Sequence, residues 1–379
     1  MTKTVSHTRS PGMGQIQPSP GEAHGQGKAP REAEPLLVVT DLVQEYATRG
    51  AGGVKTGTVH ALSGVSFELF PGETLGIVGE TGSGKSTLAR AIIQVEQPVS
   101  GSVEFQGKQM IGMSKKQLRA THAEMQMVYQ DPFGSLNPRW KVADVIAEPM
   151  LGHTTMSQRE RQERVEQLLE LVGLDPAIYC QRRPIELSGG QAQRVAIARA
   201  VALKPALIIC DEAISSLDVL IQAQVLNLFE ELRQELDLAY LFIAHDLATV
   251  KQISDSVAVM HLGQLAEIGP AEEIYAAPRH PYTRALLDSI PILDIETGEA
   301  KRPVPLKGDP PSPLDPPSGC RFRTRCPLAQ DICAEVEPRP AEVGDGTGRP
   351  HKVACHFPLE PGQMLPDRGA RPQAAAAAA

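Results

Sequence analysis

The sequence lacks any apolar run that approaches the ~20 consecutive residues needed to cross a bilayer as a helix. Residues 1–35 also lack the apolar stretch of about 7–15 residues that a secretory signal requires. They are rich in proline, glycine, serine and charged residues, a composition typical of disorder. We therefore expect a disordered segment over 1–35 and, if the protein serves transport, a channel formed by other chains.

Positive charge is outweighed by negative charge, with 37 Lys and Arg against 45 Asp and Glu. The 379 residues carry a net charge of −8, with a pI of about 5.7, so the composition does not favour the basic surface of a nucleic-acid-binding protein. We expect no nucleic-acid partner. The six cysteines come without an export signal, which argues against disulfides because the cytosol keeps thiols reduced. An apolar content of 41% is enough to bury a core in a chain of this length.

Residues 36–290 alternate apolar strand-like runs with helical patterns, which is typical of an α/β domain with a largely parallel sheet. The runs over 75–78, 207–210 and 241–243 are predicted to be buried central strands. Residues 59–69 and 102–105 alternate apolar and polar side chains, as half-buried antiparallel strands do. Two kinds of sheet are therefore predicted.

Two helices stand out by their apolar periodicity. Ser157 and Glu160 form a capping box at the start of the first, and Gly173 ends it. The second carries an apolar stripe. Its members are Ile221, Val225, Leu228 and Leu232. Because acids and bases mix on the polar sides, both stripes are predicted to be packing faces and not membrane-surface helices.

The composition changes after residue 290. Proline-rich linkers surround a cysteine-bearing stretch over 319–358, so we expect a small appended C-terminal module spanning 291–360. Residues 361–379 end in six alanines, and this low-complexity tail is predicted to be disordered. Cys180 and Cys210 lie outside the module and are predicted to be simple buried thiols.

A phosphate-binding loop is predicted between the strand over 75–78 and a helical run over 87–94. The pattern is G-x-x-x-x-G-K-[ST]. The positions that fit it are Gly79, Glu80, Thr81, Gly82, Ser83, Gly84, Lys85 and Ser86. The glycines let backbone N–H groups point at phosphates, Lys85 reaches the β- and γ-phosphates, and Ser86 can bind Mg²⁺. Thr87 completes the nucleotide-binding set. A glycine-rich turn without nucleotide is the alternative, which this many fitted positions disfavour.

Two acids follow the strand over 207–210. Asp211 and Glu212 would lie at the carboxyl edge of the sheet, where open α/β folds bind ligands. Asp211 can hold Mg²⁺, and Glu212 is placed to accept a proton from the attacking water. Two solvated acids at the start of a loop are the alternative reading, which the nearby phosphate loop disfavours.

Residues 187–194 resemble the signature motif of the ABC ATPase family. The family residues there that contact nucleotide correspond to Ser188, Gly189, Gly190 and Gln191. The other family motifs follow in order. Gln130 matches the Q-loop, Asp218 ends a stretch similar to the D-loop, and His245 matches the switch histidine. Tyr46 lies where the family places an aromatic residue against the adenine.

The resemblance implies a P-loop NTPase with a RecA-like core, an antiparallel β subdomain and a helical signature subdomain. It implies a reaction, ATP plus water to ADP plus phosphate, with ATP and Mg²⁺ bound. Glu212 would be the general base, and Gln130 and His245 would sense the γ-phosphate. Ser86, Gln130 and Asp211 would surround Mg²⁺. Because the residues at 188–191 open a helix, its N-terminus can form a second anion site. In the family that site grips ATP held by the opposite subunit.

Residues 130–139 and 280–283 resemble the peptide/nickel importer subgroup of ABC ATPases, as does the cysteine-bearing stretch. This implies import of di- or oligopeptides, with nickel, glutathione or sugars as alternatives. It also implies a second ATPase subunit, two membrane subunits, an extracytoplasmic binding protein and a place on the cytoplasmic face of the membrane. The rivals are an ABC exporter and a soluble ABC ATPase. Ribosome-acting members carry two motif sets, and DNA-repair members a long coiled coil; this chain has neither.

Four cysteines lie in the C-terminal stretch, separated by 5, 6 and 21 residues. They are Cys320, Cys326, Cys333 and Cys355. Four thiolates can hold an iron–sulfur cluster, and the related importers' ATPases resemble this pattern, so a [4Fe–4S] cluster is predicted. Zinc is the rival, although its ligands are usually paired at closer spacing; unbound thiols or a disulfide are the third reading. Three arginines between them are predicted to offset the thiolate charge. They are Arg321, Arg323 and Arg325.

Overall fold

The computed structural model describes residues 34–49, 55–290, 292–293, 300–301, 308–344 and 349–366. Its first sheet is antiparallel and has the strand order β2-β1-β4-β5. The strands are β1 (Leu37–Arg49), β2 (Lys55–Leu69), β4 (Ser100–Phe105) and β5 (Lys108–Gln109). The predicted segments 59–69 and 102–105 lie in β2 and β4, which both pair antiparallel with β1. β4 ends in an alternation of buried and partly exposed side chains, which confirms the half-buried antiparallel sheet that the sequence predicts.

The second sheet has eight strands in the order β13-β14-β10-β9-β3-β8-β7-β6. β6, β7, β8, β3 and β9 run parallel, and β10, β14 and β13 continue the sheet antiparallel. The strands are β3 (Thr74–Val78), β6 (Met125–Val128), β7 (Leu207–Asp211), β8 (Ala239–Ile243), β9 (Ser256–His261), β10 (Gln264–Pro270), β13 (Ala341–Glu342) and β14 (Lys352–Val353). Every residue of β3, β7 and β8 is buried. Helices cover both faces of such sheets, which explains the continuous apolar runs.

The described helices connect these strands. They are α1 (Lys85–Ile92), α2 (Lys115–Glu124), α3 (Pro132–Ser135), α4 (Val142–His153), α5 (Gln158–Leu171), α6 (Pro176–Tyr179), α7 (Gly189–Ala200), α8 (Val219–Leu236), α9 (Leu247–Ile253), α10 (Ala271–Ala276), α11 (Pro281–Asp288) and α12 (Ile332–Glu335). Short 3₁₀ turns occupy Pro184–Glu186 and Val201–Leu203, and β11 (Ile292–Leu293) pairs with β12 (Ala300–Lys301). In the parts of the chain that the structure describes, no helix is long and apolar enough to span a bilayer.

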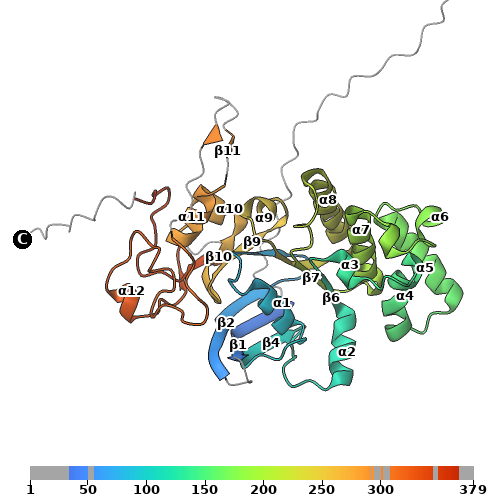
Figure 1. Cartoon of the computed structure of the whole chain (residues 1–379), viewed down its shortest axis with the longest axis horizontal. Helices are drawn as coiled ribbons and strands as arrows, with labels where there is room; N and C mark the ends of the chain where they lie inside the picture. Colours follow the sequence, from blue (N-terminus) through green and yellow to red (C-terminus); the bar gives the residue numbers. More distant parts are fainter. Residues whose placement is uncertain are drawn as a thin grey trace, which may run out of the picture. The chain divides into compact units, whose positions relative to one another are not determined.

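Helices α3 to α7 form a helical region beside β6, the edge strand of the large sheet (green in Figure 1). α5 has the predicted capping box, in which the Glu160 N–H donates to Ser157 Oγ and the Ser157 N–H donates to Glu160 Oε2. Its buried residues are Val165 and, three and four positions further on, Leu168 and Leu169, which therefore share one face with it. Both predicted amphipathic helices, α5 and α8, are confirmed.

The C-terminal segment, residues 308–366, is joined to the large sheet. β14 pairs with β10 and β13 pairs with β14. Glu267 on β10 is almost fully buried and accepts hydrogen bonds from the backbone N–H groups of Arg279 and His280. Part of the predicted C-terminal module therefore forms one edge of the main sheet. The termini predicted to be disordered lie, except for residues 34–35 and 361–366, outside the described residues.

Candidate active site

Four neighbouring parallel strands bring the predicted site residues to one edge of the large sheet. In the order β3-β8-β7-β6, the strands are followed by the phosphate loop over 79–86, by His245, by Glu212 after Asp211 at the end of β7, and by Gln130. Because parallel strands end at the same edge, segments far apart in the sequence meet there. The topology therefore places the phosphate loop and the acids in one site.

The phosphate loop depends on its glycines. Gly82 and Gly84 have φ angles of 80° and 104°, which residues with a Cβ rarely adopt. A Cβ at Gly84 would lie 2.4 Å from the backbone oxygen of Ala61, and one at Gly79 would lie 2.2 Å from that of Met260. The loop is therefore fixed by conformation and by close packing, and α1 begins directly after Gly84.

Lys85 is buried at the start of α1, with 5% of its surface exposed. Its Nζ donates to the backbone oxygens of Gly79 and Glu80, at 2.8 and 3.1 Å. Burial lowers the pKa of Lys85, and the nearby carboxylates of Glu212, Asp211 and Glu80 oppose that shift. The ammonium is thus held within the phosphate loop, where it can meet an anionic phosphate.

Ser86 and Asp211 meet across the site. Ser86 Oγ donates to Asp211 Oδ1 at 2.8 Å. Burial raises the pKa of Asp211; the hydrogen bond from Ser86 opposes the shift and the charge of Glu212 adds to it. A hydroxyl and a carboxylate oxygen at this separation are the donors that Mg²⁺ prefers. These residues therefore fit the predicted Mg²⁺ site, where a cation would relieve the repulsion between the two acids.

Glu212 is held by its backbone and by its side chain. Its N–H donates to the Ile243 oxygen at 3.0 Å, and its φ is 49°, a left-handed conformation that costs a non-glycine residue about 1 kcal/mol or more. Gln130 Nε2 donates to Glu212 Oε2 at 2.9 Å. Such strain at the end of a strand is typical of functional sites. The predicted pairing of these positions around the metal and water is therefore geometrically feasible.

The remaining predicted residues take more peripheral positions. His245 is exposed, and its Nε2 lies 3.8 Å from Asp246 Oδ2. Asp218 caps α8 by accepting from the Ile221 N–H at 3.1 Å. Tyr46 lies on β1, where its hydroxyl donates to Glu96. Their contacts with nucleotide stay predictions.

The signature residues form the N-terminus of α7. Ser188 Oγ accepts from the Gln191 N–H, and Gln191 Oε1 accepts from the Ser188 N–H at 3.0 Å, a complete capping box. A Cβ at Gly190 would lie 2.6 Å from Ile221 Cγ2, so this glycine lets α7 approach α8. Gln191 Nε2 also donates to Tyr179 Oη at 2.9 Å. These hydrogen bonds hold the start of α7 in place, as an anion site on a second molecule's nucleotide would require.

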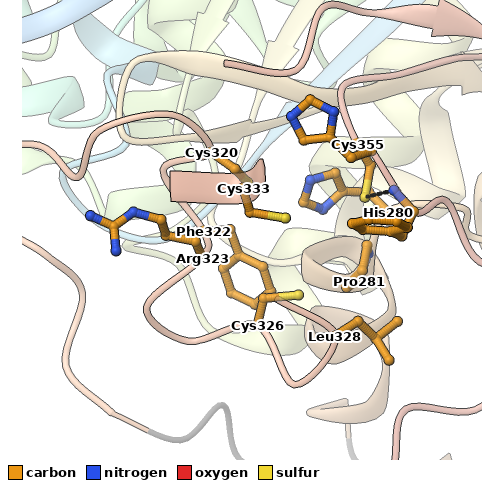
Figure 2. Close-up of a pocket in the computed structure, with 11 residues that line it drawn as sticks. His280, Pro281, Cys320, Phe322, Arg323, Cys326, Leu328, Cys333 and Cys355 are labelled. Atoms are coloured by element: carbon orange, nitrogen blue, oxygen red, sulfur yellow. Dashed lines mark hydrogen bonds between the residues drawn. The ribbon is translucent and has the colours of Figure 1, made fainter. Parts of the chain in front are cut away.

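The four C-terminal cysteines line one small cavity of about 10 Å³ together with Phe322. The side chains of Cys326, Cys333 and Cys355 point toward the space between them (Figure 2). Burial raises the pKa of the Cys355 thiol to about 12, to which the proximity of the other three contributes. Within the described residues, however, no set of three or more His, Cys, Asp or Glu side chains is arranged so that it could hold a metal ion. The arrangement itself therefore does not support the predicted cluster.

The three arginines near these cysteines fit the prediction only in part. Burial raises the pKa of Cys320, and the charge of Arg323 opposes that shift, as predicted. Arg321 donates to the backbone oxygen of Leu262, and Arg323 donates to that of Ser318 at 2.9 Å. Arg325 forms two hydrogen bonds with the carboxylate of Glu80 in the phosphate loop, at 2.6 and 3.0 Å. The expectation that Arg325 offsets thiolate charge is therefore corrected, because its guanidinium lies against the phosphate loop. Nothing local in the sequence indicates this pair, which lies 245 positions apart.

Known proteins are similar to this chain over most of its length. A family model described as ABC transporter matches residues 62–215, and one described as the C-terminal region of oligopeptide/dipeptide transporters matches residues 266–333. The oligopeptide transport ATP-binding protein AppF of Bacillus subtilis is 48% identical over 326 residues, which cover 86% of this chain and 98% of that protein. OppF of Escherichia coli is 50% identical over 299 residues, or 79% of this chain and 88% of that protein.

Solved structures share the fold. The chain matches cbiO1 from Clostridium perfringens, part of an ABC transporter complex, with a TM-score of 0.55 and 27% identity over 64% of this chain and 91% of that one. It also matches the ATP-binding cassette MJ0796 bound to ADP and phosphate, with a TM-score of 0.56 and 24% identity over 62% of this chain and 98% of that one. The fold and the phosphate site thus define an ATP-binding cassette ATPase. Within that class, the chain belongs to the family of oligopeptide and dipeptide transport ATP-binding proteins.

Proposed function

We propose that this chain binds and hydrolyses ATP to drive the uptake of di- and oligopeptides. The observation that carries the proposal is the convergence of the phosphate loop, Asp211 and Glu212 at one sheet edge. Ser86 is hydrogen-bonded to Asp211 and Gln130 to Glu212. The names of the relatives, which are oligopeptide and di/tripeptide transport ATP-binding proteins, support the substrate class.

In this proposal each site residue has one role. Lys85 binds the β- and γ-phosphates, and Ser86 and Asp211 hold Mg²⁺. Glu212 accepts the proton of the attacking water, while Gln130 orients that carboxylate and contacts the metal or the water. His245 orients the γ-phosphate. The hydrogen bonds of Lys85, Ser86 and Glu212 support these roles because they hold the three side chains in or beside the phosphate loop.

A second ATPase subunit completes the site. The capped start of α7 offers backbone N–H groups to the γ-phosphate bound by the partner, and Asp218 lies at that interface. Two nucleotides would then be held between two subunits arranged head to tail. The preformed capping box at Ser188 supports this role because it keeps the helix start ordered before the partner arrives.

The wider assembly follows from the relatives' transport role. Two membrane subunits would form the channel, an extracytoplasmic protein would deliver the solute, and this chain would act at the cytoplasmic face of the membrane. Three exposed aromatic residues flank Gln130 along the chain and support a docking surface there. They are Tyr129, Phe133 and Trp140.

We also propose that Cys320, Cys326, Cys333 and Cys355 hold a [4Fe–4S] cluster. Although their side chains are not arranged as a metal site within the described residues, all four line one cavity, and four thiolates are the donor set that such clusters take. A cavity of about 10 Å³ holds roughly one water molecule, so the loops would have to separate to admit four irons. When bound, the cluster would tie four chain segments together by metal–sulfur bonds. Zinc at the same thiolates is the alternative.

Uptake into proteoliposomes tests the transport proposal. The chain would be assembled with its membrane subunits and binding protein, with Mg·ATP enclosed on the side of the ATPase. Labelled di- and oligopeptides, nickel, glutathione and an oligosaccharide would be offered on the opposite side, where the binding protein acts. We expect ATP-dependent entry of the peptides, and none with Lys85→Ala. ATP-dependent entry of another solute without competition by peptides would replace the substrate class. Efflux would overturn the assignment as an importer.

A further inference from the structure

The C-terminal segment contacts the phosphate loop through an ion pair in which the arginine is buried and the glutamate is partly exposed. The guanidinium of Arg325, whose side chain is 4% exposed, lies against Glu80, whose side chain is 26% exposed. Both terminal nitrogens take part, Nη1 with Oε2 at 2.6 Å and Nη2 with Oε1 at 3.0 Å. Two parallel bonds of this kind fix orientation as well as distance.

Two further hydrogen bonds hold the backbone of Glu80. Its N–H donates to the hydroxyl of Tyr282 at 3.1 Å, and its backbone oxygen accepts from Lys85 Nζ at 3.1 Å. Arg325 therefore holds the side chain of Glu80, the same residue whose backbone oxygen accepts a hydrogen bond from the ammonium of Lys85. A shift of Glu80 would therefore move a lysine that the site depends on.

Aromatic packing anchors the turn that carries Arg325. The ring of Phe322 lies 5.2 Å from that of Tyr282 and 5.5 Å from that of His261. The Arg325 N–H donates to the Phe322 oxygen at 3.0 Å. The turn that carries Arg325 is thereby anchored on α11 and β9, so its side chain meets the phosphate loop in one defined position.

The charge balance gives this contact a consequence for nucleotide binding. Partial burial of Glu80 opposes its ionisation, but the hydrogen bonds and charge of Arg325 prevail and hold the pKa of Glu80 below its ordinary value. Glu80 is therefore an anion within a loop that must accept a polyanion. His261 Nδ1 lies 3.9 Å from Glu80 Oε2, but burial lowers the pKa of His261 to about 4, so that ring is neutral at pH 7. Arg325 supplies the neutralising charge.

We propose that Arg325 is a positioning residue for ATP binding that acts through Glu80. It neutralises the carboxylate beside the phosphates and holds the loop on which Lys85 rests. The proposal rests on the phosphate loop being the nucleotide site, as proposed above. The C-terminal segment thereby becomes part of the nucleotide-binding machinery without touching the nucleotide.

Removing one partner of a buried pair leaves the other as an uncompensated charge, whereas removing both is nearly neutral. Arg325→Met should therefore weaken binding of Mg·AMP-PNP by the full chain about tenfold, within the usual range of coupling between distinct sites. Glu80→Gln should weaken binding less than Arg325→Met, because its amide oxygen can still accept one hydrogen bond from Arg325 and the charge that remains is positive, which a polyanion offsets. Glu80→Gln/Arg325→Met should recover most of the loss. Arg325→Lys, which keeps the charge but loses the two-pronged geometry, should fall between wild type and Arg325→Met.

Calorimetric titration of the wild type and these four variants tests this, with Arg339→Met as the matched control because Arg339 is exposed in the same segment. In the assembled transporter Arg325→Met should raise the KM for ATP and leave kcat nearly unchanged, whereas a purely structural role would lower kcat and the thermal midpoint with KM unchanged. A lower kcat and thermal midpoint with an unchanged KM would overturn the proposal. A double variant that binds no better than Arg325→Met would also overturn it. Lys85→Ala distinguishes failure of the Arg325 proposal from failure of the proposed nucleotide site. If Lys85→Ala binds AMP-PNP as tightly as the wild type, the assignment of the phosphate loop as the nucleotide site fails.

Discussion

Gln130 and Glu212 are 82 positions apart in the sequence, yet the Gln130 amide donates to the Glu212 carboxylate at 2.9 Å. The two residues follow neighbouring strands, β6 and β7, so the contact is a product of strand order. Among the described residues no hydrogen bond to Glu212 Oε1 is formed, so that oxygen is available to a water molecule, and the bond to Oε2 restrains the rotation of the carboxylate. A carboxylate held in this way is suited to act as a general base.

Glu212→Gln should abolish turnover and leave ATP binding intact. The amide has nearly the shape of the carboxylate but cannot accept the proton of the attacking water, so kcat should fall by about 10²–10⁴-fold. Lys85, Ser86 and Asp211 are unchanged in this variant, so nucleotide should remain bound and trap a dimer. Phosphate release and size-exclusion chromatography with ATP measure the two effects.

Glu231→Gln is the control for that experiment, because Glu231 is an exposed acid on α8 and should leave turnover near the wild-type rate. Turnover by Glu212→Gln at the rate of this control would remove Glu212 from the role of base. Loss of ATP binding together with turnover would instead assign Glu212 to binding.

The phosphate site was predictable from the sequence because its determinants are local. The spacing from Gly79 to Ser86, the preceding apolar strand and the following helix all lie within one stretch of chain. The acids at the end of β7 were predictable for a similar reason, since a buried strand ending in two carboxylates indicates a sheet edge. The confirmed strands β3, β7 and β8 needed only their apolar runs.

The contacts of the C-terminal segment were not predictable in this way. β14 has only two residues, Lys352–Val353, too few for a periodic pattern to be visible. Arg325 lies among cysteines, so sequence proximity assigned its charge to thiolates, while the fold places it on Glu80. Contacts between distant segments depend on how the chain returns to the sheet, and no local pattern encodes that path.

Gly79→Ala should destabilise the protein more than Gly82→Ala. A Cβ at Gly79 would lie 2.2 Å from the backbone oxygen of Met260, where no flexible side chain can give way, so we expect a loss of roughly 2–4 kcal/mol. At Gly82 nothing lies within 4 Å and only the φ of 80° is unfavourable, for a cost of about 1 kcal/mol. Urea denaturation of both variants compares them. Equal losses would mean that the close packing at Gly79 is relieved by movement of β9.

Cys320→Ser/Cys326→Ser should remove the metal that we propose for the four-cysteine cavity. We expect the wild-type chain, purified without oxygen, to contain about four irons and to absorb broadly in the visible range, and the double variant to have lost both. Cys180→Ala is the matched control because Cys180 is a buried thiol outside this cavity. One zinc per chain would replace the cluster by a structural zinc site. A metal-free wild type would reduce the four residues to ordinary thiols.

His351 should make the stability of the sheet edge depend on pH. The ring is nearly buried between two carboxylates, with Nε2 2.8 Å from Glu267 and Nδ1 3.0 Å from Glu273. Burial disfavours the imidazolium, but the hydrogen bonds and charges of the two glutamates prevail and raise the pKa of His351 above 6.5. Since the folded protein holds this proton more tightly than the unfolded chain, the stabilisation is fully present below the ordinary pKa. It is lost as the pH rises through the folded value.

The free energy of unfolding of the wild type should therefore exceed that of His351→Gln by the largest margin near pH 5.5, and the margin should shrink toward pH 8.5. The difference between the two proteins is the informative quantity, because His261 and His280 act in the opposite direction. Burial lowers the pKa of both to about 4, so their contribution is present above pH 6.5 and falls as the pH drops toward 4. Both proteins carry these two residues, and their effect cancels in the comparison. Urea denaturation at a series of pH values gives the margin, and a margin that stays constant or grows with pH would show that His351 is neutral between its two glutamates.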